Sequence, residues 1–298
     1  MSRKTSSMIA VLALSLSSTV SLGHLAFAGE DFSVGPQYDT THVYVSPENV
    51  DQFAKSFSET FGGASTRQVV ATVTPTPSST TSQLVQTPAG TVSLFGFKTP
   101  IPSPFGAERN GYLVTDLDAA VDAARAAGAV LTVAPFPDPI GRDAVVQWPG
   151  GVNMQLYWHT SKPHYDQLKT VPENRIYASA DSVAAFTEAF LKFSGGKIVS
   201  DDSNASGLEI GRPDYKFRLL RIESGYGKMA VFVTDGHLPY PYGHEVAGYE
   251  TDKLSETLDR AQKSGAKILA GPYRSGGRDS AMVDFPGGYV AEIHSTAP

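Results

Sequence analysis

The chain of 298 residues contains no cysteine, and this absence excludes several kinds of chemistry. Without a thiol there is no disulfide, no thiolate metal ligand and no cysteine nucleophile. Basic runs are also lacking, since 24 Lys and Arg residues stand against 30 Asp and Glu residues and the net charge is −6. The sequence therefore predicts neither nucleic acid nor an anionic membrane surface as a partner.

Long apolar runs are missing too, except at the N-terminus. A basic start and a mostly apolar stretch from Met8 to Leu22 precede Ala26-Phe27-Ala28, which has the small-residue pattern of a cleavage site. The pattern predicts a signal peptide over residues 1–28, cleaved after Ala28, and a secreted or periplasmic mature protein. No other segment is long and apolar enough to cross a bilayer, so no membrane contact is expected after cleavage.

The chain repeats itself, and the repeat decides its organisation. Three short segments recur at similar spacing: Pro104-Phe105-Gly106-Ala107-Glu108 as Pro241-Tyr242-Gly243-His244-Glu245, Gly141-Arg142-Asp143 as Gly277-Arg278-Asp279, and Trp148-Pro149-Gly150-Gly151 as Phe285-Pro286-Gly287-Gly288. An internal repeat of this kind indicates two tandem copies of one structural unit. The repeated Gly-Arg-Asp is interpreted as a turn that locks the following hairpin, with substrate contact as the alternative.

Each copy divides further into two modules that read as one strand, one helix and a set of strands. Val43 and Val45 alternate with polar neighbours, which is strand periodicity. Asp116 is placed to cap the second helix and Gly128 to end it. The modules are expected over residues 42–100, 108–159, 175–236 and 244–296.

Residues 161–173 are predicted to link two domains, 29–160 and 174–298, each large enough for its own core. Two polar segments, Thr74 to Thr87 and Asp201 to Pro213, are predicted to be loops in equivalent places of the two copies.

A βαβββ module used four times, with the ending GRD…(W/F)PGG…(Q/E)(L/I), resembles the vicinal-oxygen-chelate superfamily. This superfamily includes glyoxalase I, extradiol dioxygenases and bleomycin-resistance proteins. The resemblance covers nearly all of the mature chain. It implies an α+β fold of glyoxalase/bleomycin-resistance/dihydroxybiphenyl-dioxygenase type. The four modules would pair into two half-barrel domains, here called cups, with the helices outside and a pocket inside each cup.

Strand alternation assigns side chains to these cups. If the apolar residues of each strand pack under the helices, the polar ones between them face the cup. The first cup would then hold His42, Tyr44, Gln155 and Tyr157. The second cup would hold Arg175, Tyr177, Glu292 and His294.

The resemblance also implies metal ligands on the first and last strands of the modules, and this chain supplies only part of such a set. The first copy has His42 and Gln155, but Ser93 stands where a metal-using glyoxalase has Glu. The second copy has Glu292, but the position of its first ligand is Arg175. A guanidinium stays protonated in proteins and cannot ligate a metal.

Two interpretations of the second cup stay open. In one, a divalent Zn, Ni, Fe or Mn ion is bound by His244, Glu292 and His294, helped by His237. In the other, Arg175 and Glu292 form an ion pair where a metal would have joined their strands.

The second cup is predicted to be the functional one because charge and aromatic character converge there. Arg175 would hold an anionic group, Tyr177 would stack or hydrogen-bond, and Glu292 with His294 would act as an acid and base pair. We expect an exported protein that binds a small polar or aromatic molecule and has a degenerate metal site. A metal-dependent lyase or extradiol-dioxygenase-type enzyme, and a non-catalytic scaffold, remain the alternatives.

Overall fold

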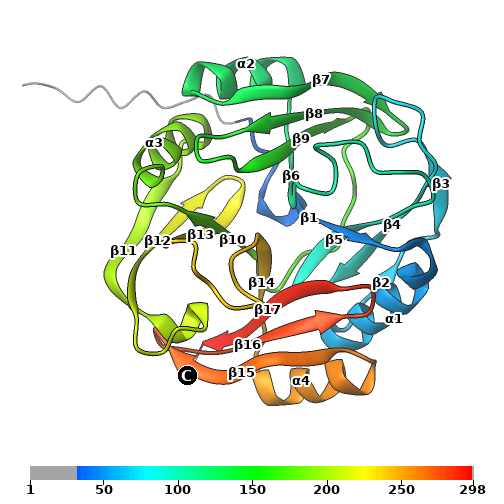
Figure 1. Ribbon diagram of the computed structural model, residues 1–298. Coiled ribbons are helices and arrows are strands. Elements are labelled where there is room, and N and C mark those ends of the chain that lie inside the picture. The colour runs from blue at the N-terminus through cyan, green and yellow to red at the C-terminus, as the bar shows by residue number, and fades with distance from the viewer. Residues whose placement is uncertain (1–31, 297–298) are drawn as a thin grey trace, which may run out of the picture.

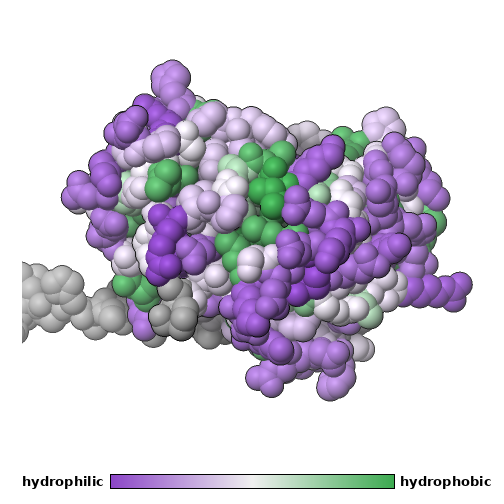
Figure 2. All heavy atoms as spheres, turned by 90° about the horizontal axis from the view of Figure 1, so that it is seen from below, coloured by the Kyte–Doolittle hydropathy of each residue, from purple (hydrophilic) through white to green (hydrophobic). Residues whose placement is uncertain are grey.

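The computed structural model describes residues 32–296, and the expected signal peptide lies outside them. The described chain forms two strongly curved sheets with two helices each, one sheet from each copy (Figure 1). This is the predicted α+β pair of half-barrels. None of the described helices is long and apolar enough to cross a membrane. The face of the molecule in Figure 2 is mostly hydrophilic, with an apolar area near its middle.

The first copy forms a nine-stranded sheet in the order β2-β4-β5-β1-β6-β9-β8-β7, with β3 paired to β4. Its elements are β1 (Asp39–Val45), α1 (Val50–Phe61), β2 (Ala64–Ser65), β3 (Val69–Ala71), β4 (Thr80–Thr87), β5 (Gly90–Phe97), β6 (Asn110–Leu113), α2 (Leu117–Ala127), β7 (Val130–Asp138), β8 (Gly141–Gln147) and β9 (Asn153–His159).

The second copy forms an eight-stranded sheet in the order β11-β12-β13-β10-β14-β17-β16-β15. Its elements are β10 (Glu173–Ala178), α3 (Val183–Ser194), β11 (Lys197–Ser206), β12 (Lys216–Ser224), β13 (Gly227–Val233), β14 (Val246–Glu250), α4 (Leu254–Lys263), β15 (Lys267–Ser275), β16 (Arg278–Phe285) and β17 (Tyr289–Thr296).

The centre of each sheet is the junction of its two modules. There the first strands of the modules pair antiparallel, β1 with β6 and β10 with β14. Each of these strands also pairs in parallel with the last strand of its own module, as β1 does with β5 and β6 with β9. Four central strands of each copy therefore bring equivalent positions of two modules to the floor of one cup.

The helix between β6 and β7 illustrates how local sequence sets element boundaries. The Asp116 side chain accepts a hydrogen bond of 3.0 Å from the Ala119 amide at the start of α2. Gly128 follows the last turn with a φ of 114°, a left-handed conformation that favours glycine. Both predicted boundary residues are confirmed.

The helices lie between the two copies, where α1 contacts α4 and α2 contacts α3 (Figure 1). The ring of Phe57 on α1 is 5.2 Å from that of Tyr249 and 5.3 Å from that of Phe285, both in the second copy. Phe190 on α3 lies 5.7 Å from Trp148 of the first copy. Two apolar clusters thus each combine one module from each copy. The expectation of a separate core in each copy is wrong, because the helices share their apolar stripes across the junction.

The two segments predicted as polar loops contain parts of strands, and the second also contains a 3-10 helix at Gly207–Ile210. β4 covers Thr80–Thr87, where Val85 belongs to the core and Ser82 lines a cavity. β11 extends through Ser206, with an irregular register between Asp202 and Ala205. Polar residues on the cup side of β4 and on the exposed edge strand β11 conceal the usual apolar alternation, so composition alone indicated loops.

Because the copies share both clusters, we expect them to unfold together. Phe57→Ala removes a ring that is fully buried between the copies, and large truncations of this kind cost about 3–5 kcal/mol. Urea unfolding followed by tryptophan fluorescence and by circular dichroism should show one transition, shifted to lower urea in the variant. Two separate transitions in the unmodified protein would contradict a shared core.

Candidate functional site

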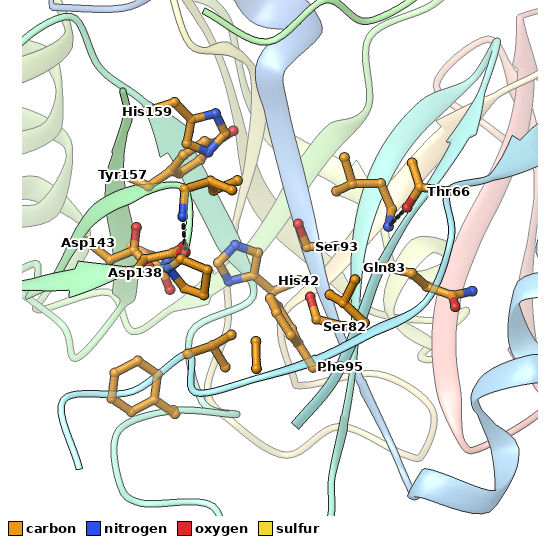
Figure 3. A pocket seen from close by; sticks show the side chains of 18 of the residues that line it. His42, Thr66, Ser82, Gln83, Ser93, Phe95, Asp138, Asp143, Tyr157 and His159 are labelled. Carbon is orange, nitrogen blue, oxygen red and sulfur yellow. Dashed lines mark hydrogen bonds between the residues drawn. The ribbon is translucent and has the colours of Figure 1, made fainter. Parts of the chain in front are cut away.

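A cavity of about 300 Å³ lies in the first cup. The side chains predicted to face this cup, His42 and Tyr44 on β1 and Gln155 and Tyr157 on β9, all line it. Val43, between the first two, is fully buried in the core on the other face of β1. Alternation along the strands therefore locates the wall of the cavity. Figure 3 shows His42 between the strands of the two modules, with Ser93 and Phe95 on one side and Asp138 and Asp143 on the other.

A fully buried carboxyl group lies behind this wall. Tyr44 donates a hydrogen bond from its hydroxyl to Glu108 Oε1. The His42 Nδ1 atom is 3.5 Å from the same oxygen, and it makes no hydrogen bond within the described chain. Burial and the neighbouring Glu108 raise the pKa of Tyr44 well above its ordinary value. The phenol therefore stays protonated and keeps donating to Glu108.

Two further carboxyl groups meet at one end of the cavity. Asp138, at the end of β7, and Asp143, on β8, are hydrogen-bonded to each other through their side chains. Burial, followed by the charge of Asp138, raises the pKa of Asp143 well above its ordinary value. Burial also raises the pKa of Asp138. The pair therefore holds a proton at pH values where an exposed aspartate has lost it.

The interpretation of Gly-Arg-Asp as a turn lock missed this pair. Arg142 does not contact Asp143 but turns outward to Asp118, with nitrogen–oxygen distances of 2.7 and 3.0 Å. Adjacent strand residues point to opposite faces, so an Arg facing out puts the following Asp into the cup. The alternation of side chains along β8 was therefore the sequence signal that places Asp143 in the cup. Asp138 carried no such signal, because its position depends on how β7 bends.

The second cup contains a buried ion pair at its centre. Arg175 Nη1 lies 3.1 Å from Glu292 Oε1, and His294 Nδ1 lies 2.8 Å from Glu292 Oε2. All three side chains are at most 3% exposed. Burial alone would raise the pKa of Glu292, but Arg175 and His294 outweigh it and hold that pKa far below its ordinary value. Arg175 also lies 4.6 Å above the ring of Phe232.

Apolar side chains fill the space that is open in the first cup. Ser82 pairs in register with Phe95, and the corresponding partner of Phe232 is Leu219. Ser93 is likewise replaced by Ala230, the register partner of Arg175. Leu219 and Ala230 are packed in an apolar cluster with Phe232. The sequence favoured the second cup as the functional one, but this geometry favours the first.

The remaining second-cup candidates lie at its surface. Tyr177 lines a shallow depression together with Arg109, His244 and Glu245. Partial desolvation of the His244 ring, followed by the charge of Arg109, lowers the pKa of His244. His237 is 89% exposed and lies 3.9 Å from Asp235.

Sequence reasoning also missed Glu173, which it assigned to the linker. This carboxylate begins β10 and is buried between Arg278, at 2.9 and 3.1 Å, and Arg221. Burial would raise its pKa, but the two guanidinium groups outweigh that effect and lower the pKa to about 2. The second Gly-Arg-Asp segment thus uses its Arg for a buried ion pair, unlike the first.

Neither cup has the donor set of a metal site. The described residues contain no group of three His, Cys, Asp or Glu side chains that could hold a metal, so His244 does not join Glu292 and His294. In the first cup, a Cβ atom at Gly111 would lie 2.3 Å from His42 Nε2, which leaves no room there for a ligand side chain. Gly248 is in the equivalent place of the second cup, where a Cβ would lie 2.7 Å from Glu292 Oε2. Ser93 and Gly111 in the first cup therefore supply no ligand, and neither do Arg175, Ala230 and Gly248 in the second.

If the pair of Arg175 and Glu292 is structural, breaking it should unfold the protein rather than only weaken binding. Arg175→Met leaves Glu292 as an unpaired buried charge, which costs about 3–5 kcal/mol. The double variant Arg175→Met, Glu292→Gln should recover most of that loss. Thermal denaturation of the two variants provides the test. A single variant as stable as the unmodified protein would show that the pair does not hold the second cup together.

Sequence comparisons identify no relative of the chain: no protein-family model matches it, and no curated protein matches it significantly. Comparison with solved structures identifies proteins of similar fold. A triple mutant of 4-hydroxymandelate synthase from Streptomyces coelicolor matches with a TM-score of 0.57 and 12% identity, over 90% of this chain and 93% of that one.

A Mn(II)-bound glyoxalase from Novosphingobium aromaticivorans matches with a TM-score of 0.57 and 15% identity, over 89% of this chain and 84% of that one. A fusion of a xylose isomerase-like TIM barrel with 4-hydroxyphenylpyruvate dioxygenase matches with a TM-score of 0.53 and 12% identity, over 90% of this chain and 49% of that one. These likenesses agree with the four-module sheets described above, and the chain has the fold of the vicinal-oxygen-chelate superfamily.

Proposed function

We propose that the protein binds a small polar or aromatic molecule in its first cup, without a resident metal. The observation that carries the proposal is the cavity itself, whose wall combines hydrogen-bonding and aromatic side chains. Its volume of about 300 Å³ is at the lower end for ligand pockets, which suits a molecule of one ring. The ring of His42 forms part of this wall beside Ser93 and Phe95.

A metal-dependent lyase or extradiol-dioxygenase-type enzyme is the second candidate, favoured by the likeness to a Mn(II)-bound glyoxalase. The donor sets of both cups speak against it, because two central positions of the first cup and three of the second hold residues that do not ligate a metal. The third candidate, a scaffold without a ligand, gives no reason for polar side chains around an open cavity.

A large side chain placed in the cavity of the first cup should weaken ligand binding. Ala71 lines the cavity from β3, whereas its neighbour Val70 is 60% exposed and is not part of the wall. Ala71→Trp should therefore weaken binding of single-ring phenols at least about tenfold, while Val70→Trp should leave it unchanged. Calorimetry with tyramine, 4-ethylphenol and 4-hydroxyphenylacetate measures this.

Elemental analysis of the same protein, purified without added metal or chelator, belongs to that experiment. Stoichiometric metal that is lost in Glu292→Ala would favour the enzyme candidate. Failure of all three phenols to bind would favour the scaffold.

Export is part of the proposal and is supported by the basic start, apolar stretch and small-residue cleavage pattern of residues 1–28. Expression of the full chain in a bacterium should give a periplasmic or secreted product whose N-terminal residue is Gly29. Replacing Ala28 by a bulky residue, as in Ala28→Phe, should block cleavage. A cytoplasmic product that retains Met1 would contradict this prediction.

A further inference from the structure

The cavity of the first cup has an acidic end. Asp143 is 4% exposed on β8, and Asp138 faces it from the end of β7 (Figure 3). The Ile140 amide donates a hydrogen bond of 3.0 Å to Asp138 Oδ1 and fixes the orientation of that carboxyl group. Glu108, fully buried behind the wall, acts on Asp143 as a third carboxyl group.

Among the described residues that line the cavity, no buried cation balances these groups. Arg142 points outward to Asp118, and Arg109 lies over the ring of Tyr44, 5.7 Å from its centroid. Burial lowers the pKa of His159, which keeps this ring neutral near neutral pH. Arg67 belongs to the cavity wall but is exposed to solvent. The acidic end is therefore left without a permanent counter-ion.

Aromatic rings form much of the remaining wall. Tyr44 and Phe95 lie 5.3 Å apart, and the His42 ring meets Phe95 edge-on at 5.6 Å. Phe105 and Tyr157 also line the cavity. The electron-rich faces of such rings attract organic cations, and carboxyl groups accept hydrogen bonds from an ammonium group.

We propose that the ligand of the first cup is a small organic amine in its protonated form, with its ring against the aromatic wall and its ammonium group at Asp138 and Asp143. The inference rests on the proposed function, since it names the ligand class of the same cavity. In this inference, Asp138 and Asp143 bind the ammonium group and take part in no chemical step.

Binding of a cation should release a proton from the pair. The groups around Asp143 are Asp138 on β7, Glu108 before β6, His42 and Tyr44 on β1, and Tyr157 and His159 on β9. In the free protein the raised pKa values keep the pair partly protonated. A bound ammonium favours the ionised carboxylate, so affinity for the amine should rise as pH increases through those pKa values.

Three phenols of similar size separate charge from shape. Tyramine carries an ammonium group, 4-ethylphenol is neutral and 4-hydroxyphenylacetate carries a carboxylate. We expect calorimetry to show tyramine binding at least about tenfold more tightly than 4-ethylphenol, and 4-hydroxyphenylacetate binding most weakly. The preference for tyramine should increase from about pH 5 to about pH 8, a range in which an alkylamine stays protonated.

Asp143→Asn should remove most of the preference for tyramine and its pH dependence. Asn has nearly the shape of a protonated Asp, so the variant should retain its fold. The repeat offers a matched control in Asp279→Asn, the corresponding position of the second cup, where the side chain is 40% exposed and lies 3.6 Å from Arg274. This control should bind like the unmodified protein. Asp138→Asn provides a second test of the pair.

The outcomes are distinguishable. Equal binding of tyramine and 4-ethylphenol, or tighter binding of 4-hydroxyphenylacetate, would overturn the amine inference and leave the proposed binding function intact. A preference for tyramine that persists in both Asp138→Asn and Asp143→Asn would overturn the assigned position of the ammonium group. If none of the three phenols binds, the binding function itself fails.

Discussion

Packing of the four helices between the two sheets is the interaction on which the rest of the structure depends. One face of each central strand is committed to these shared clusters, so a strand cannot slip by one residue without moving its apolar side chains out of the core. The opposite residues are thereby forced into the cup. His42 and Tyr44 line the cavity because Val43 is held in the cluster beneath them.

The two copies use the same framework in opposite ways. In the first cup, Ser82 and Ser93 leave space between the strands, and polar and aromatic side chains line that space. In the second cup, Leu219 and Ala230 close the space around Arg175 and Glu292. A buried ion pair contributes little net stability, yet its charges depend on each other once they are removed from water.

Sequence reasoning reached the fold because it depends on repeated, local signals. The duplicated motifs, the alternation around Val43 and the capping residues Asp116 and Gly128 each act over a few positions. The choice between the cups depends instead on which side chains meet across the strands, such as Leu219 beside Phe232, and the sequence alone does not give that register. Glu173 was missed because Arg278, its partner, is distant in the chain. Asp138 was missed because the register between β7 and β8 is irregular before it, which hides the face to which its side chain points.

Gly111 and Gly248, on the central strands β6 and β14, limit which side chains can be added to the cups. Gly111 supports the His42 ring so closely that any larger residue must displace it, and Gly248 does the same beneath Glu292. Introducing a histidine at Gly111 alone would thus push aside the one good ligand already present. A ligand at Gly111 therefore requires a second replacement that makes room for the His42 ring. A single replacement at this position favours a change in the shape of the cavity wall over a gain of metal chemistry.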